Sequence, residues 1–373
     1  MLLSDTHPLV ADRTHDSRLI QALLGKRPEV TPVWFMRQAG RSLPEYRALR
    51  AGGDMLAACL DPALASEITL QPVRRHGVDA AIFFSDIVIP LQLAGLDVSI
   101  VPGRGPVFAE AVNTSAAIAA VTAIDPAILR ERAEPIIQAV QRTTELLAEL
   151  SQERGEPIPL IGFAGAPFTL AAYLVEGGPS KDHLAARALM NSDPSGWHAL
   201  LEWLAAVTGE FLAVQVEAGA SAAQLFDSWA GALSASDYRE HALGASQQAL
   251  RAVRAITPGA SLSHIPLIHF GVGAGELLVD MASLKVDALG VDYRVPLDEA
   301  ARRVGSSFTL QGNLDPALLF APESVRNAAI DRVLTEGRAV RAHIFNLGHG
   351  VPQHAEPEVI TSVVRRVHEW RAE

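Results

Sequence analysis

Two arginines follow an apolar run near the start of the chain. Residues 33–36 are apolar, and Arg37 and Arg41 follow them with only Gln38, Ala39 and Gly40 between the two charges. An apolar run that ends in charge indicates a buried strand that reaches a working face. A guanidinium group offers a planar fork of donors that matches a carboxylate or a phosphate. The pair therefore predicts an anion site, with structural ion pairs to acidic residues of the same chain as the alternative.

Asp86 is a single carboxylate inside a second apolar run. Burying an ionised carboxylate is costly unless a cation or a ligand donor meets it. Two readings follow from this placement. Asp86 either pairs with Arg37 or Arg41 as part of the structure, or it accepts hydrogen bonds from a ligand.

Three further polar residues stand just beyond apolar runs. Tyr173 falls in the helix expected after the third run, where most tyrosines belong to the core and satisfy their hydroxyl there. Ser228 has no G-x-S-x-G elbow around it, which argues against a hydrolase nucleophile but leaves its hydroxyl available to a ligand. His349 lies between two glycines, which permit close approach of a ligand.

Composition excludes several other classes of protein. A net charge of −11 over 373 residues argues against a general nucleic-acid binder, which needs a basic face. Cys59 is the single cysteine, so the chain has no internal disulfide and no cysteine-based zinc site. The histidines match no ligand spacing, and no metal site is expected.

The predicted location is the cytoplasm. The N-terminal residues show no basic stretch followed by an apolar core, as a secretion signal would. Residues 158–175 are almost long enough to cross a bilayer, but Pro159, Gly162, Gly165 and Pro167 interrupt them. A strand followed by a turn and a helix explains that segment better than a membrane span, and no membrane contact is expected.

Apolar runs of strand length alternate with helical patterns along the chain. The runs cover residues 33–36, 80–84, 159–163, 222–226, 266–270, 288–291, 308–310 and 343–347. Helix start signals lie between them, such as Asp61-Pro62 and Asp193-Pro194. Eight such units predict an α/β fold, a (β/α)₈ barrel of the TIM type with an N-terminal helical extension. A doubly wound open sheet is the alternative, but it would gather only some of the polar strand ends at one place.

The same pattern predicts one domain over residues 1–373. Residues 1–16 read as a flexible lead, followed by a short helix over residues 17–24. Glycines at 103 and 105 predict a loop or hairpin, and Ser234 predicts the start of a single helix over residues 238–256. One rival motif remains: Gly271, Gly273 and Gly275 with Asp292 imitate a dinucleotide fingerprint, although the third glycine is misplaced by one position.

Several segments resemble the signature blocks of the uroporphyrinogen decarboxylase family. They are Pro32-Val-Trp-Phe-Met-Arg-Gln-Ala-Gly-Arg-Ser-Leu-Pro-Glu-Tyr-Arg47, Gly162-Phe-Ala-Gly-Ala-Pro-Phe-Thr169, Phe84-Ser-Asp-Ile87, Leu225-Phe-Asp-Ser-Trp-Ala-Gly231, Leu310-Gln-Gly-Asn-Leu-Asp-Pro316 and Asn346-Leu-Gly-His-Gly350. The resemblance runs from about residue 17 to the C-terminus, and the loop after residue 269 matches least well.

This resemblance implies a homodimeric (β/α)₈ barrel that needs neither metal nor organic cofactor. It implies a carboxy-lyase of haem biosynthesis that converts the four acetate side chains of uroporphyrinogen III to methyl groups, giving coproporphyrinogen III. Arg37 and Arg41 would bind substrate carboxylates, helped by Gln38 and the backbone of Ala39 and Gly40. Asp86 would accept hydrogen bonds from the pyrrole N–H groups, and Tyr173, Ser228 and His349 would complete the pocket, with Asp86, Arg37 and Tyr173 as the catalytic set.

Two other functions stay open at this stage. Barrel methyltransferases of the same superfamily hold zinc with a histidine and cysteines, which a lone Cys59 does not favour. A tetrapyrrole carrier would keep the pocket without the chemistry. Against a carrier stands the joint presence of Arg37, Arg41, Asp86, Tyr173 and His349.

Overall fold

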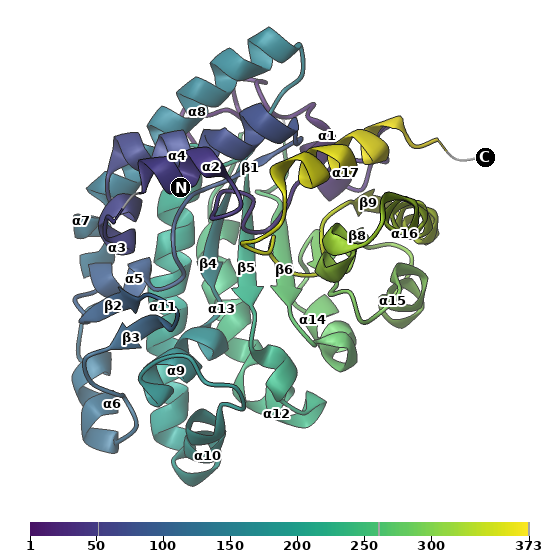
Figure 1. Ribbon diagram of the computed structural model, residues 1–373. Helices are drawn as coiled ribbons and strands as arrows, with labels where there is room; N and C mark the ends of the chain where they lie inside the picture. Colours follow the sequence, from purple (N-terminus) through teal and green to yellow (C-terminus); the bar gives the residue numbers. More distant parts are fainter. Residues whose placement is uncertain (51, 260–261, 372–373) are drawn as a thin grey trace.

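The computed structural model describes residues 1–50, 52–259 and 262–371, and its centre is a curled parallel sheet (Figure 1). The strands of that sheet are β1 (Ala81–Ile82), β4 (Leu160–Gly165), β5 (Ala222–Asp227), β6 (Leu267–Gly271), β7 (Ala288–Gly290), β8 (Thr309–Gln311) and β9 (Ala342–Ile344). These seven strands of the described chain pair in sequence order and are all parallel. Seven of the eight predicted apolar runs are therefore confirmed as strands. Their burial on both faces explains why they are almost purely apolar.

The first apolar run is held like a strand but forms only an isolated bridge, in which Val33 pairs in parallel with Phe345. The Phe345 N–H donates to the Pro32 carbonyl at 2.8 Å, and the Trp34 N–H donates to the Phe345 carbonyl at 3.3 Å. On its other side, the Val33 carbonyl accepts from the Asp79 N–H at 2.8 Å. This segment therefore lies between the chain that enters β1 and the chain that leaves β9.

Hydrogen bonds across the interior show how strongly the sheet curls. Gln311 of β8 donates from Nε2 to Oε1 of Gln224 in β5 at 3.0 Å, although these strands are three places apart in the sheet. Gln311 also accepts from the Trp34 indole Nε1 at 3.0 Å. Only a sheet rolled toward a cylinder brings β5, β8 and the first apolar run into contact.

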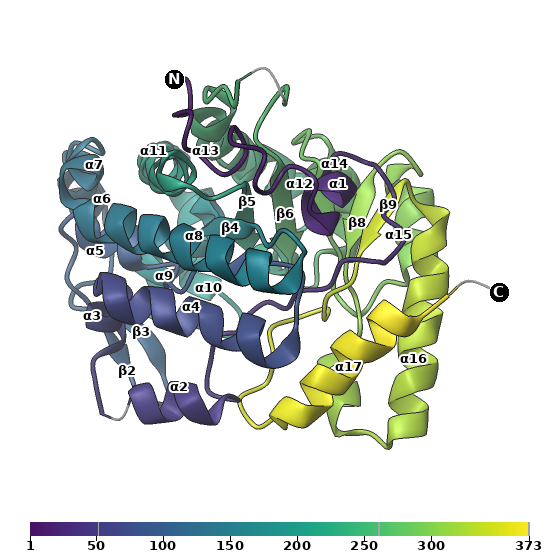
Figure 2. The same cartoon turned by 90° about the horizontal axis from the view of Figure 1, so that it is seen from above.

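Helices surround the sheet (Figure 2). The longer ones are α4 (Pro62–His76), α8 (Glu134–Arg154), α9 (Pro167–Glu176), α10 (Leu184–Ser192), α11 (Pro194–Ala218), α13 (Leu243–Arg254), α15 (Leu297–Val304), α16 (Glu323–Glu336) and α17 (Pro357–Glu369). The shorter ones are α1 (Arg18–Leu23), α2 (Pro44–Leu49), α3 (Met55–Cys59), α5 (Ile89–Leu93), α6 (Ser115–Thr122), α7 (Ile128–Arg132), α12 (Ala235–His241) and α14 (Leu278–Ala282). Along the first part of the chain, α4 packs against α8, α8 against α11, and α11 against α13. Further along, α14 packs against α15, α15 against α16, and α16 against α17, which packs back against α4.

Local sequence signals start and stop the predicted helices. Asp61 Oδ1 accepts from the N–H groups of Ala63 and Leu64, at 2.9 and 3.0 Å, and caps α4. That helix ends at Gly77, whose φ of 71° suits glycine. The helix expected over residues 238–256 is instead two, α12 and α13, because the chain breaks at Ala242 with φ −133°. The hairpin expected near Gly103 is confirmed as the antiparallel pair β2 (Val98–Val101) and β3 (Gly105–Phe108).

Residues 1–16, which the sequence predicts to be a flexible lead, pack against the rest of the chain in the structure. Leu9 is fully buried, and the ring of His7 hydrogen-bonds the Val216 carbonyl of α11 at 2.8 Å. The Leu3 N–H donates to the Thr257 carbonyl at 3.0 Å. The apolar residues of this segment are too sparse to show periodicity, so their burial is not visible in the sequence.

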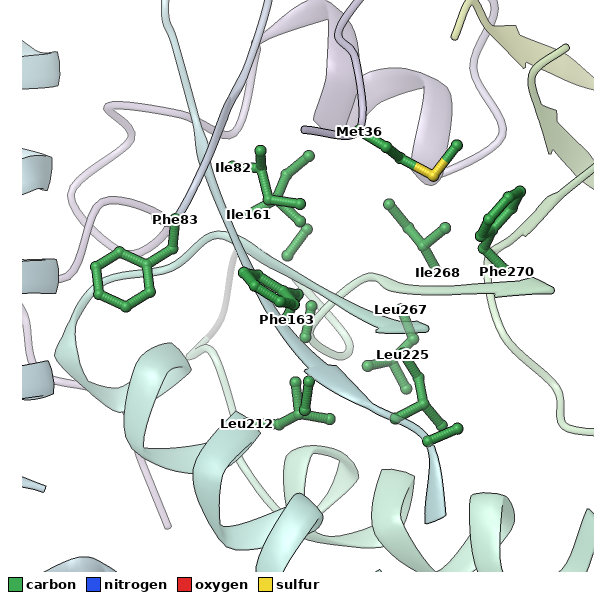
Figure 3. Packing of buried hydrophobic residues seen from close by; sticks show 14 of the residues in the cluster. Met36, Ile82, Phe83, Ile161, Phe163, Leu212, Leu225, Leu267, Ile268 and Phe270 are labelled. Atoms are coloured by element: carbon green, nitrogen blue, oxygen red, sulfur yellow. The ribbon is translucent and has the colours of Figure 1, made fainter. Parts of the chain in front are cut away.

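The buried core occupies both faces of the sheet. Figure 3 shows Ile161 and Phe163 of β4 with Ile268 and Phe270 of β6 in one cluster, which also includes Met36. One helix of the described residues, α11, is long and apolar enough to cross a membrane by length and composition, but 78% of its apolar window is buried in the core. Burial inside the protein accounts for that composition.

Gln38 ties the first apolar run to β1, which gives a stability prediction. Its Oε1 accepts from the Phe35 N–H and its Nε2 donates to the Ala80 carbonyl, both at 3.0 Å and both buried. Gln38→Ala leaves these two backbone groups unpaired and is expected to lower the free energy of unfolding by about 2–4 kcal/mol. Urea denaturation measures this, with exposed Gln138→Ala as the control. Equal midpoints for the two variants would contradict the role of Gln38.

Candidate active site

The predicted site residues come from the carboxyl ends of parallel strands. Asp86 follows β1, Ser228 directly follows β5, and His349 follows β9. Arg37 follows the first apolar run, and Tyr173 lies in α9, the helix after β4. Because the carboxyl ends of parallel strands share one edge, these residues belong to one mouth of the curled sheet.

Four of these residues lie close enough for the charges of Arg37 and Asp86 to shift the pKa values of their neighbours. Burial raises the pKa of Asp86, and the nearby charge of Arg37 partly offsets that rise. Burial raises the pKa of Tyr173 to about 12, and the charge of Asp86 adds to the rise. Burial and the charge of Arg37 both lower the pKa of His349. The structure therefore brings Arg37, Asp86, Tyr173 and His349 together.

Asp86 has no arginine partner among the residues that the structure describes. Its Oδ1 accepts the Val88 N–H at 3.1 Å, and no ion pair within 4.0 Å joins it to Arg37 or Arg41. The structural ion pair that the sequence left as an alternative is therefore not formed. The residue is half-buried, and partial loss of hydration makes its ionised form less favourable, so donors supplied by a ligand would stabilise the charge.

Arg37 takes an unusual backbone conformation, with φ 59° in the left-handed region. Its aliphatic stem runs over Gly350, where a Cβ would meet Cδ of Arg37 at 2.6 Å. A Cβ at Gly348 would collide with the backbone of Tyr293 at 2.2 Å. The glycines beside His349 thus make room for other parts of the protein, rather than for a ligand as the sequence suggested.

The rest of the arginine segment divides into inward and outward residues. Arg41 is exposed, and its guanidinium donates to Oε1 of Gln353 at 3.0 Å. Gln38 points inward and uses its amide in the two backbone hydrogen bonds described above, so that amide is not directed at a ligand. Ala39 and Gly40 are half-buried between the two arginines.

His349 and Tyr173 are both neutral near pH 7, because burial opposes charge on either ring. The Gly350 N–H donates to Nδ1 of His349 at 2.8 Å, which leaves the proton of the neutral ring on Nε2. The Tyr173 ring stacks on Trp229, with centroids 3.8 Å apart and an angle of 25° between the planes. Both side chains can therefore donate a hydrogen bond to a negatively charged ligand.

The sequence missed residues that support this mouth. Asp227 is fully buried at the end of β5, directly before Ser228. Its neighbour Trp229 is stacked between Tyr173 and His183, and Arg294 adds a positive charge near His349. Asp227 and Trp229 lie in the quoted block Leu225–Gly231, where only Ser228 was given a role, because the partners of the other two come from other parts of the chain.

Asp227 is a buried acid without a good partner. Burial raises its pKa to about 7, although the Thr169 hydroxyl donates to Oδ1 at 2.9 Å and moderates the rise. Nε2 of His269 lies 4.0 Å from Oδ2, and burial lowers the pKa of His269 to about 3. That distance exceeds a hydrogen bond, and burial favours the neutral form of both groups, so they do not form an ion pair.

Neither a metal site nor a dinucleotide site appears in the described residues. No group of three or more potential ligand side chains comes together in the part of the chain that the structure describes. Asp292, the acidic residue of the rival glycine motif, accepts the Gly273 N–H and pairs with Arg294 at 2.6 Å. Its carboxylate is therefore occupied within the protein instead of facing a ribose.

The chain is similar to known proteins over nearly its whole length. Residues 14–370 match the model of the family described as uroporphyrinogen decarboxylase. A uroporphyrinogen decarboxylase from Leifsonia xyli is 59% identical, with 99% of each chain covered. One from Arthrobacter sp. is 56% identical over 95% of this chain and 98% of its own. A solved methyltransferase structure from Methanosarcina mazei has a TM-score of 0.74 over 95% of this chain and 98% of its own, and its 17% identity bears on the fold alone.

Asp227 makes stability depend on pH. Its pKa is about 7 in the folded chain against an ordinary value of 3.8, so between these values the folded state holds the proton that the unfolded state has lost. The free energy of unfolding therefore falls as pH rises from about 4 to about 7. Asp227→Asn keeps an oxygen for Thr169 and removes this loss, so its advantage over the parent is expected to grow by about 2–3 kcal/mol between pH 5 and pH 8.

Urea denaturation at both pH values measures this difference. Asp97→Asn, a change at an exposed carboxylate, serves as the control and is expected to shift the parent's curve equally at the two pH values. A constant difference between Asp227→Asn and the parent would show that the Asp227 carboxyl is not perturbed.

Proposed function

The chain belongs to the uroporphyrinogen decarboxylase family, and from this we propose that it removes carbon dioxide from the four acetate side chains of uroporphyrinogen III. The product would be coproporphyrinogen III, an intermediate of haem biosynthesis, and the enzyme a carboxy-lyase. The full-length match to curated decarboxylases carries this conclusion. The geometry of the mouth supports it, because cationic and neutral donors surround one unpaired carboxyl.

Arg37 and Arg41 are proposed to bind substrate carboxylates. A tetrapyrrole with acetate and propionate side chains is a ring-shaped polyanion, and exposed guanidinium groups at the mouth offer fork-shaped donors to its rim. Within the described part of the chain, the Arg41 guanidinium donates to the neutral Gln353 amide and forms no ion pair, so its charge is not cancelled there. The backbone of Ala39 and Gly40, half-buried between the two arginines, is proposed to assist this binding, and Gln38 contributes by anchoring the segment through its bond to the Ala80 carbonyl.

Asp86 is proposed to accept hydrogen bonds from the pyrrole N–H groups at the centre of the ring. Loss of carbon dioxide needs an electron sink, and protonation of a pyrrole carbon creates a cationic iminium that serves as one. A fixed anion stabilises that cation in the transition state more than it stabilises the neutral pyrrole. The absence of an arginine partner leaves the Asp86 charge available for this purpose.

Tyr173, Ser228 and His349 complete the proposed pocket. The pKa of Tyr173, about 12, keeps its phenol protonated, so it donates a hydrogen bond to a substrate carboxylate. Nε2 of neutral His349 and the Ser228 hydroxyl offer further donors. The pyrrole acts as its own electron sink, so the proposal requires neither a metal nor an organic cofactor. Lys285 precedes β7 and thus lies at the amino end of that strand, away from the mouth, where it cannot form an imine with the substrate.

A zinc methyltransferase function is disfavoured by Cys59. This single cysteine is fully buried, and burial raises the pKa of its thiol, so a metal-binding thiolate is unfavourable. A non-catalytic tetrapyrrole carrier is the remaining alternative. Incubation of the purified protein with uroporphyrinogen separates the two, because an enzyme yields hepta-, hexa-, penta- and tetracarboxylate products and a carrier yields none.

We also propose that residues 1–373 form one domain with a closed eight-stranded barrel. Val33 pairs with Phe345 on one side and accepts a hydrogen bond from Asp79 on the other. This supports the first apolar run as the strand that closes the barrel. The contact of α17 with α4 supports closure of the outer helix layer. Slow amide exchange at Trp34 and Phe345, comparable to that of the central strands, is the corresponding measurement.

The family resemblance leads us to propose a cytoplasmic homodimer. Sedimentation equilibrium of the purified protein is expected to give twice the mass of the 39.8 kDa chain. A single-chain mass at micromolar concentration would exclude a stable dimer. Cell fractionation tests the location, and recovery in the membrane fraction would contradict it.

Asp86→Asn tests the mechanism. The amide keeps the size of the side chain but removes its charge, so the fold is expected to survive while kcat falls about 100-fold or more. The rate of decarboxylation of uroporphyrinogen is the measurement. Asp97→Asn, at an exposed position, is the control and is expected to keep the parental rate. A folded Asp86→Asn variant with parental kcat would remove the charge of Asp86 from the mechanism.

A further inference from the structure

A network of contacts joins α9 to the end of β5 and the loop after it. We call its residues, the buried Thr169 and Asp227 and the half-buried Tyr173 and Trp229, the Trp229 clamp. Thr169 and Tyr173 are four residues apart in α9, so they lie one turn apart on the same side of that helix. Asp227 ends β5, and Trp229 follows it by two residues. The clamp therefore connects two neighbouring strand ends at the mouth.

Hydrogen bonds form the inner half of the clamp. The hydroxyl of Thr169 donates to Oδ1 of Asp227 at 2.9 Å and accepts the Trp229 N–H at 3.2 Å. Thr169 and Asp227 are both fully buried, so water does not compete for these bonds. One hydroxyl thus links the carboxyl and the backbone on either side of Ser228.

Aromatic stacking forms the outer half of the clamp. The Trp229 ring lies between Tyr173, at a centroid distance of 3.8 Å, and His183, at 4.2 Å, with interplanar angles of 25° and 26°. His183 directly precedes α10 and takes a left-handed conformation, with φ 52°. Both faces of the indole are covered, so the plane of Trp229 fixes the plane of the Tyr173 ring.

The position of Asp227 is costly for stability. Its Oδ2 has no hydrogen-bond partner, and the hydroxyl of Tyr238 and both ring nitrogens of His269 also lack one within the described residues. Buried polar atoms without partners destabilise a fold. A buried carboxyl that lowers the stability of the fold in this way is expected to have a role in the neighbouring substrate site.

We propose that Thr169 and Asp227 are positioning residues of the decarboxylase, which act through the clamp to hold Ser228 and Tyr173 against the substrate. This inference rests on the proposed function, because the residues positioned are the proposed substrate contacts. Ser228 is held because both of its sequence neighbours bond to Thr169, one by a side chain and one by a backbone N–H. Tyr173 is held because its ring stacks on the residue after Ser228. Displacement of positioned groups by about 1 Å lowers rates by up to about 100-fold.

Thr169→Val is the sharpest test, since valine has the shape of threonine without the hydroxyl. We expect kcat on uroporphyrinogen to fall about 10- to 100-fold, with a smaller change in KM, because Arg37 and Arg41 still bind the substrate rim. Thr169→Ser restores the hydroxyl and is expected to recover most of that kcat. The near-ultraviolet circular dichroism of Thr169→Val should also lose the contribution of the Tyr173 and Trp229 stack, while the far-ultraviolet spectrum stays unchanged.

Thr143→Val is the matched control. Thr143 is also fully buried in a helix and donates its hydroxyl to the Ala139 carbonyl at 2.6 Å, but it lies in α8, away from the mouth. It is expected to lose stability without losing kcat. If Thr169→Val and Thr143→Val keep the same kcat and the same near-ultraviolet spectrum as the parent, the proposal is wrong.

A second pair of variants covers the case in which Thr169→Val does not fold. Trp229→Phe keeps an aromatic plate and the backbone N–H, whereas Trp229→Leu keeps only the N–H. The clamp predicts that the leucine variant loses at least tenfold more kcat than the phenylalanine variant, and equal rates would overturn it. A parent protein that leaves uroporphyrinogen unchanged refutes the proposed function, whereas an active parent with indifferent variants refutes only the clamp.

Discussion

A half-buried carboxyl group with no ion pair to a cation of the described chain is the constraint around which this molecule is organised. Asp86 lies in the segment that follows β1, where the nearby charge of Arg37 partly offsets the rise in its pKa without forming an ion pair. An ion pair with arginine would stabilise the carboxylate in the unliganded protein and make it less available to a ligand. The arrangement is unfavourable until donors arrive from a ligand, which is the behaviour expected of an electrostatic site prepared in advance.

The fold supplies the rigidity that this site requires. The segment before Arg37 is bonded on one side to the chain entering β1 and on the other to the chain leaving β9. Gln38 adds two buried bonds directly after it, and the stem of Arg37 packs on Gly350. The guanidinium group of Arg37 is exposed, but the backbone and the aliphatic stem that carry it are held in place. The side chain therefore loses less conformational entropy when it binds an anion.

The sequence predicts the strands and the mouth well but not the contacts that support them. Strands buried on both faces must be apolar, so β4 to β9 stand out without any knowledge of the fold. Gln38 and Asp227 were not recognised as supports because their partners, Ala80 and Thr169, are distant in sequence. The break at Ala242 was missed for a similar reason, since α12 and α13 carry one continuous helical pattern and only packing separates them.

The pairing of Val33 with Phe345 has a consequence for synthesis. A ribosome releases residue 33 long before residue 345 exists, so the arginine segment emerges without the neighbour that later holds it. His349, which shares the mouth with Arg37, arrives later still. The mouth that Arg37 shares with His349 can therefore be assembled only after nearly the whole chain has been made, and its closure depends on a contact of very high sequence separation.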